Sequence, residues 1–280
     1  SAASDVYKRQ PKVLVDNLRF ASGDLYDERN VQKTYTYFGR LSALKYTNIR
    51  FFETQNGDST QLNCYVMLTK SKHKSISFEL EGTNSAGDLG AAASVSFQHR
   101  NLFRGSETFM VKFRGAYEAI SGLQPGYKNH NYTEYGVETS INFPNFLFPF
   151  LTSDFKRRIK ATTEFGLQYN YQLRPEFSRT IASASWSYKW MQKQKIQHRI
   201  DLLDISYLYL PWISSQFQED YINKDKDNYI LKYNYENRLI VRMGYNYSYN
   251  SAGGALVNNT ITTNSDSIRA GFESAGNILY

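Results

Sequence analysis

The chain contains few of the residues that mark several common protein classes. One cysteine in 280 residues excludes a disulfide scaffold, a CxxC redox pair and a multi-thiolate zinc site. No stretch approaches the ~18 consecutive apolar residues of a transmembrane helix. The longest apolar run, 143–151, is interrupted by Pro144 and Pro149. Charged residues at 21% and aromatic residues at 16% also exclude an acidic or low-complexity disordered chain.

Residues typical of catalytic or metal sites are equally scarce. The sequence has no G-x-S-x-G, Walker A or HExxH motif. Its four histidines lie far apart and without metal-ligand spacing: His73, His99, His130 and His198. The single cysteine, Cys64, is expected to be a buried small hydrophobic residue. We therefore predict no catalytic, metal or cofactor-binding residues, no cofactor and no enzymatic activity.

The positive charge has no localised pattern. There are 33 Lys and Arg against 26 Asp and Glu, giving a net charge of +7. The basic residues are spread over alternate strand positions and turns, as at 156–158 and 193–195, and form no helical stripe. We therefore predict contacts with a lumen, a rim and lipid headgroups, and no nucleic-acid partner.

Period-2 alternation dominates the sequence after residue 74. Thirteen residues, 159–171, alternate almost without interruption between apolar and polar side chains, and 109–117, 182–190 and 239–250 repeat the pattern. Shorter alternating stretches occur at 75–81, 89–98, 134–141, 198–210 and 267–273. The pattern predicts eight or nine strands in residues 75–280. Residues 214–238 fit either a long loop or a loop plus another strand.

The two faces of these strands differ in a way that favours a membrane barrel. One face mixes small residues with Tyr, Phe and Trp, and the aromatic residues gather toward strand ends, as at 169–171, 186–190, 207–212 and 245–249. Such grouping is typical of an aromatic girdle at a lipid–water interface. The other face carries polar residues such as Glu134, Glu138 and Glu164, which suit a water-filled lumen. A transmembrane antiparallel β-barrel is favoured, and a soluble β-sandwich is the alternative.

Residues 11–74 are predicted to form a small α+β module. Asp27 can cap a helix that runs to about Leu44 and buries Val31, Tyr35, Phe38 and Leu41. Two strand-like runs, 47–53 and 61–69, flank an Asn-Gly pair at 56–57, which is a strong hairpin signal. A basic junction at 70–74 then leads into the alternating region.

The passage 78–107, FELEGTNSAGDLGAAASVSFQHRNLFRGSE, carries a family resemblance. It resembles the start of the barrel in the BamA/TamA outer-membrane assembly-factor superfamily (the bacterial surface-antigen domain), and is most similar to its Bacteroidetes TamA-like (TamL) members. The matching residues are Glu81, Gly82, Gly87, Gly90, His99, Arg100, Asn101, Leu102, Phe103, Gly105 and Glu107. Residues 11–74 look like the last POTRA domain, the periplasmic module that precedes the barrel in this family.

The resemblance implies a mainly β fold: the N-terminal half of a transmembrane antiparallel barrel preceded by one POTRA module. About half of the family's barrel strands precede Tyr280, and the lumen plug motif and closing strand are missing, so we expect the chain to be a fragment. An unclosed barrel would leave strand edges unpaired in lipid. Residues 1–10 (SAASDVYKRQ) resemble a translated adapter remnant and are expected to be non-native.

The resemblance also implies two sites. Residues 75–82 would be the first barrel strand, with Ile76, Phe78, Leu80 and Gly82 on one side of a lateral gate that templates client strands. The alternative is a fully paired strand without a gating role.

The second implied site is the first periplasmic turn, formed by Asn101, Leu102, Phe103 and Gly105. Its expected role is geometric, because Gly105 can adopt positive φ and so set the hairpin register. An ordinary glycine-containing hairpin loop is the alternative reading.

The implied function is protein insertion into, or translocation across, the bacterial outer membrane, by strand templating and without covalent chemistry. The implied partners are unfolded outer-membrane proteins, a periplasmic or assembly-complex partner bound by the POTRA module, and outer-membrane lipid. A polypeptide secretion pore or passive channel on the same barrel plan is the alternative. A barrel-borne enzyme would need a Ser/His pair that the spacing does not offer.

Overall fold

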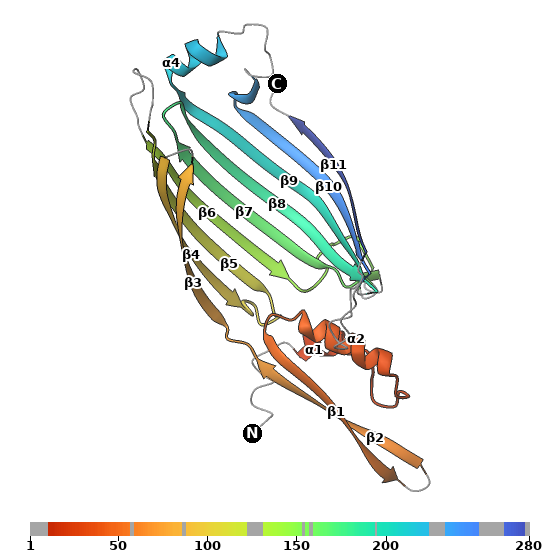
Figure 1. Cartoon of the computed structure of the whole chain (residues 1–280). Helices are drawn as coiled ribbons and strands as arrows, with labels where there is room; N and C mark the ends of the chain where they lie inside the picture. Colours follow the sequence, from red (N-terminus) through yellow and green to blue (C-terminus); the bar gives the residue numbers. More distant parts are fainter. Residues whose placement is uncertain are drawn as a thin grey trace.

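The structure, a computed structural model, describes residues 11–56, 59–85, 88–121, 131–152, 155–156, 159–193, 195–223, 233–251 and 266–277. The expected remnant, the Gly57 of the hairpin turn, His130 and the basic pair 157–158 lie outside these residues. A small N-terminal α/β unit lies at one end of a large curved sheet (Figure 1). We call the end of the sheet next to this unit the proximal end, and the other the distal end.

The N-terminal unit contains α1 (Pro11–Asn17), α2 (Glu28–Gly39), β1 (Leu44–Asn56) and β2 (Ser59–Lys70). The Asp27 side chain caps α2 as predicted, by accepting a hydrogen bond from the Arg29 N–H at 2.9 Å. Val13, Phe38 and Leu41 form a small buried core, with partly buried Leu14, Leu18, Leu44, Val66 and Leu68 packed against it.

Two details of this unit differ from the prediction. The helix ends at Gly39 rather than near Leu44, because β1 already begins at Leu44 and Gly39 favours helix termination. The predicted hairpin forms, with Asn56 opposite Ser59, and it extends beyond α2 (Figure 1). Cys64, opposite Phe51 in this hairpin, is exposed, so the prediction that it is buried was wrong.

The large sheet has nine antiparallel strands, each hydrogen-bonded to its neighbours in chain order. They are β3 (Lys74–Ser85), β4 (Asp88–Arg100), β5 (Thr108–Ala119), β6 (Asn131–Phe143), β7 (Thr162–Leu173), β8 (Phe177–Gln192), β9 (Ile196–Ile213), β10 (Arg238–Asn250) and β11 (Ser267–Asn277). All nine alternating stretches of the sequence are strands. The first and last strands, β3 and β11, form the two edges of the sheet.

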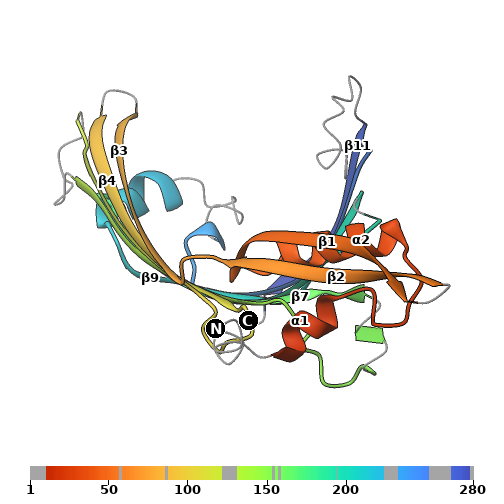
Figure 2. The same ribbon diagram turned by 90° about the horizontal axis from the view of Figure 1, so that it is seen from below.

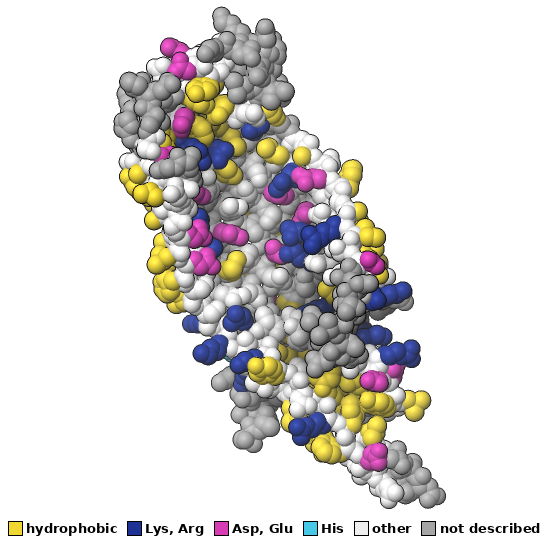
Figure 3. Space-filling view, viewed as in Figure 1, with side chains coloured by type: hydrophobic (Ala, Val, Ile, Leu, Met, Phe, Trp, Pro, Cys, Tyr) yellow, Lys and Arg dark blue, Asp and Glu magenta, His cyan; other side chains and the backbone are white. Residues whose placement is uncertain are grey.

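The sheet bends into an open trough (Figure 2). Its register places the predicted apolar set on one face across many strands; for example, Phe78, Val95, Phe113, Val137 and Tyr169 lie in one cross-strand row. The charged side chains of the other set lie within the concave face, and apolar side chains gather along its margins (Figure 3).

The apolar face is therefore convex and has no protein layer over most of its surface. Its large exposed side chains include Phe78, Phe113, Tyr135, Leu167, Tyr169, Met243 and Phe272. A soluble sandwich would bury such a face against a second sheet, and the part of the chain that the structure describes contains no second sheet on this side.

Residues 214–238 contain no strand before Arg238 among those that the structure describes. Instead, a short helix α4 (Ser215–Phe217) continues into a π-helical turn η2 (Gln218–Ile222) at the distal end, over the concave side (Figure 2). No helix in the described ranges is long and apolar enough to cross a membrane.

Candidate functional site

The four residues predicted for a gate lie on the edge strand β3. Ile76, Phe78 and Leu80 point to the convex face and are 61%, 74% and 85% exposed. Gly82 follows in the same alternation, and no atom lies within 4 Å of where its Cβ would be. Within the described strands, β3 is paired on one side only, with β4.

On its concave side, β3 is held by two ion pairs that cross β4 to reach β5. Lys112 Nζ lies 2.8 Å from Glu79 Oε2, and Arg114 Nη2 lies 2.9 Å from Glu81 Oε2. The Ser94 hydroxyl of β4 also donates to Glu79, at 2.9 Å. Sequence reasoning did not single out Glu79 and named Glu81 only as part of the family resemblance, although their two-residue spacing on a strand was a usable signal.

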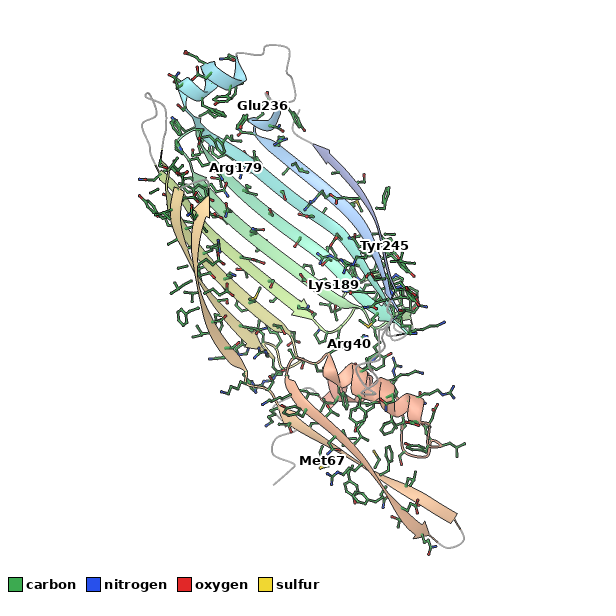
Figure 4. All side chains as sticks on the ribbon, in the orientation of Figure 1. Arg40, Met67, Arg179, Lys189, Glu236 and Tyr245 are labelled. Carbon is green, nitrogen blue, oxygen red and sulfur yellow. The ribbon has the colours of Figure 1, made fainter. Side chains whose placement is uncertain are left out.

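Two further carboxylates of the concave face, Glu164 and Glu134, have local partners. Glu164 accepts from Lys189 at 2.5 Å, toward the proximal end (Figure 4). Glu134 accepts from Asn170 at 2.6 Å and from the Tyr132 hydroxyl. These interactions are those of a polar wall between strands, and the two carboxylates have separate partners.

The β4–β5 turn is built around the buried Glu107. The Glu107 carboxylate accepts hydrogen bonds from the backbone N–H groups of Phe103 and Gly105, both at 3.0 Å. Asn101 Oδ1 accepts from the Ser106 N–H at 3.0 Å. The turn is therefore a closed hydrogen-bonded unit rather than an open loop.

The conformational role assigned to Gly105 was wrong. The positive φ angles of the turn belong to Asn101 (82°), Arg104 (69°) and Ser106 (69°), and Gly105 is not among the positive-φ residues. A Cβ on Gly105 would lie 2.2 Å from Glu107 Oε1. A side chain at position 105 would displace the Glu107 carboxylate, which accepts from the Phe103 and Gly105 N–H groups, and only the folded turn could reveal this.

The same turn joins the sheet to the N-terminal unit. The Ser42 hydroxyl donates to the Ser106 carbonyl at 2.9 Å, and the Ala43 N–H donates to the Ser106 hydroxyl at 3.3 Å. A second contact is made at Lys160, whose ammonium donates to the Asp16 carbonyl and lies 5.3 Å from the Tyr37 ring centroid.

Aromatic side chains form a continuous row on the convex face at the proximal end. Successive ring centroids from Phe103 through Phe143, Phe165 and Trp186 to Tyr188 lie 6.4, 6.2, 5.4 and 5.9 Å apart. We call these five residues the proximal aromatic row.

Beyond this row, further aromatic contacts follow along the strand ends of β8, β9 and β10. His198 stacks on Trp190 at 4.7 Å and hydrogen-bonds the Tyr245 hydroxyl at 2.8 Å (Figure 4 shows Tyr245). At the distal end, Tyr207 and Tyr209 stack at 6.3 Å. The predicted gathering of aromatic residues at strand ends is confirmed.

Among the residues that the structure describes, no three His, Cys, Asp or Glu side chains form a group that could hold a metal ion.

Comparison with known proteins supports the fold but gives no sequence family. Neither a protein-family model nor a curated protein matches the sequence. The structure is similar to BamA from Haemophilus ducreyi lacking POTRA domains 1–3, with a TM-score of 0.53 and 13% identity over 96% of this chain and 46% of that one. It is also similar to CdiB from Acinetobacter baumannii, with a TM-score of 0.50 and 10% identity over 95% and 44% of the two chains.

The chain thus spans less than half the length of either solved structure. At these identities the similarity shows the fold: the nine-stranded sheet resembles part of a BamA-type barrel.

Proposed function

We propose that this chain is part of an outer-membrane β-barrel protein that inserts polypeptides into, or moves them across, the bacterial outer membrane. The observation that carries the proposal is the combination of an exposed apolar convex face and a charged concave face on one curved sheet. Such faces match lipid on the outside and water on the inside of a barrel. The BamA-type fold is consistent with this reading.

In this proposal the working element is β3. Its outer edge presents backbone N–H and C=O groups without a partner in the described strands, and an incoming extended polypeptide can pair with such an edge by β-augmentation. The ion pairs of Glu79 and Glu81 keep β3 attached to the sheet while its edge is used. Neither step requires a covalent reaction, so the proposed protein is not an enzyme.

The N-terminal unit takes the place of a POTRA module in the periplasm. It would bind a periplasmic or assembly-complex partner, and the clients at β3 would be unfolded outer-membrane proteins. The contacts at Ser106 and Lys160 hold this unit at the proximal end of the sheet, where it would meet polypeptides before they reach β3.

Secretion of a polypeptide through the concave trough is the second candidate function. The charged concave face and the fold similarity to CdiB favour it. The two candidates differ in the surface that a client touches, which is the β3 edge for insertion and the concave wall for secretion.

Photo-crosslinking distinguishes these possibilities. A photoreactive residue replaces Ile76 on β3 or, as the control, Leu167 on β7. The two side chains are 61% and 62% exposed and lie in one cross-strand row on the convex face, but β7 has a neighbour on both sides. A third probe replaces Gln168 on the concave face.

The protein in vesicles is then given an unfolded outer-membrane barrel precursor. Insertion at the edge predicts adducts at position 76 and few at 167 or 168. Secretion predicts adducts mainly at 168. Equal labelling at 76 and 167 would show that β3 has no special role.

A further inference from the structure

The connection between β6 and β7 lies at the proximal end of the sheet. β6 ends at Phe143 and β7 begins at Thr162, so the connection comprises the 18 residues 144–161. The β4–β5 turn at the same end comprises only residues 101–107. The first part of this connection, 144–151, has the sequence PNFLFPFL.

This apolar segment lies against the convex face. The Thr163 hydroxyl donates to the Asn145 carbonyl at 2.8 Å and accepts from the Leu147 N–H at 2.9 Å. The Tyr188 hydroxyl donates to the Leu147 carbonyl at 3.0 Å. Thr163 and Tyr188 are cross-strand partners in the same alternation as Phe165 and Trp186, on the convex side.

The contacts fix the backbone of the segment firmly. Thr163 is 0% and Tyr188 3% exposed beneath it. Prolines at 144 and 149 exclude a continuous helix or a central strand over these residues. The segment 144–151 is therefore an irregular strip of chain held in place on the outer surface of the sheet. We call it the ledge.

The side chains of the ledge extend the proximal aromatic row outward. Phe146 packs on Tyr188 with ring centroids 4.7 Å apart, Phe148 lies 6.4 Å from Phe146, and Phe150 lies 5.6 Å from Phe148. Phe146 and Phe148 are half-buried, and Phe150 is 86% exposed. An extended apolar strip of this kind calls for an apolar partner.

The charge near the ledge in the sequence favours a membrane interface as its partner. Residues 156–160 read KRRIK, so four basic residues follow the aromatic strip after the four residues 152–155. Aromatic rings at the acyl boundary with adjacent lysine and arginine are the composition of segments that lie in a membrane interface. The ledge is also continuous with the convex apolar face, which is the proposed lipid-facing surface.

We propose that residues 144–151 are an interfacial lipid-binding ledge, whose Phe148 and Phe150 insert among the phospholipids of the leaflet next to the N-terminal unit. This inference rests on the proposed membrane location of the sheet. Lys160, which follows the ledge in the same β6–β7 connection, contacts Asp16 and Tyr37 of the N-terminal unit, so this connection would link that leaflet to the unit. The ledge would thereby fix how far the unit stands from the bilayer.

The test places an environment-sensitive fluorophore at single cysteines in a Cys64→Ser background. The sites are Phe150→Cys on the ledge, Lys195→Cys as the control in the exposed proximal β8–β9 turn, and Leu167→Cys in the middle of the convex face. The protein is reconstituted in phosphatidylethanolamine–phosphatidylglycerol vesicles. Nitroxide lipids with shallow or deep labels, and aqueous iodide, serve as quenchers.

If the ledge lies in the membrane interface, the fluorophore at position 150 should lose about half or more of its emission to the shallow nitroxide, which lies ~5–10 Å below the headgroups. Position 195 should be quenched by iodide only, and position 167 by the deep nitroxide. Iodide quenching at 150 with lipid quenching at 167 would overturn the ledge and leave the proposed function intact. Iodide quenching at both would overturn the two together.

Discussion

The orientation of the sheet can be tested by placing one charge on each face of β7. Leu167 and Gln168 are adjacent, both exposed, and point to the convex and concave faces respectively. Gln168 has Glu138 as its cross-strand partner, so an arginine there faces a carboxylate. The substitutions Leu167→Arg and Gln168→Arg therefore add the same side chain to opposite faces of one strand.

The expected effects differ because of what covers each face. Leu167 lies five residues from the strand start at Thr162. At ~3.4 Å per residue and a tilt of ~45°, that is about 12 Å, or half of a ~25 Å apolar band. An arginine at the bilayer midplane costs ~2–4 kcal/mol, which changes the unfolding equilibrium about 30-fold to several-hundred-fold. Gln168→Arg should cost less than about 0.5 kcal/mol, as for a wetted surface.

The assay is equilibrium unfolding from vesicles in guanidinium, followed by tryptophan fluorescence. Leu167→Arg should lower the midpoint without changing the slope, and Gln168→Arg should leave both unchanged. If both variants match the parent within about 0.5 kcal/mol, the convex face is in water and the barrel interpretation is wrong. A larger loss for Gln168→Arg would reverse the assignment of the faces.

Three further predictions concern the β4–β5 turn, the β3 ion pairs and the α2 cap. Gly105→Ala should cost about 1–3 kcal/mol, because its Cβ would meet the Glu107 carboxylate, and hydrogen exchange should then accelerate at the turn amides. The Glu79–Lys112 pair should show coupling in a double-mutant cycle that disappears in 1 M salt, where the Debye length is ~3 Å; coupling that survives would refute a solvent-screened pair. The α2 backbone lowers the pKa of the Asp27 carboxyl below its ordinary 3.8, so its contribution to stability should be present above that pH and be lost as pH falls through the lowered value. Asp27→Asn should abolish this acid sensitivity of α2 amide exchange.

The strands could be predicted because alternation is a local property of the sequence. Leu167, Tyr169 and Tyr171 alternate with polar residues, and this period predicts an extended chain with one apolar face. The hairpin of the N-terminal unit was predictable for a similar reason, since an Asn-Gly pair between two strand-like runs is a local signal for a turn. The helix end was not, because the competing strand β1 begins only five residues after Gly39.

The sequence predictions that were wrong or incomplete concern residues whose surroundings are formed by parts of the chain that are distant in sequence. Cys64 alternates like a buried residue, but it is exposed on the β1–β2 hairpin, which extends beyond the helix α2. Gly105 looked like a positive-φ residue, but its role is to leave room for Glu107. The segment 144–151 looked like an interrupted apolar run, and nothing local indicated that it lies on the outer face of β7 and β8.

The sequence by itself predicted that eight or nine strands form, each with one apolar and one polar face, because side-chain period depends only on neighbours along the chain. Which face is convex, and whether the apolar one is covered, was decided only by the tertiary structure. Strand twist and register accumulate over nine strands to set the curvature. The same assembly brings Ser42 to Ser106 and Leu147 to Tyr188, contacts between residues 64 and 41 positions apart that no local pattern encodes.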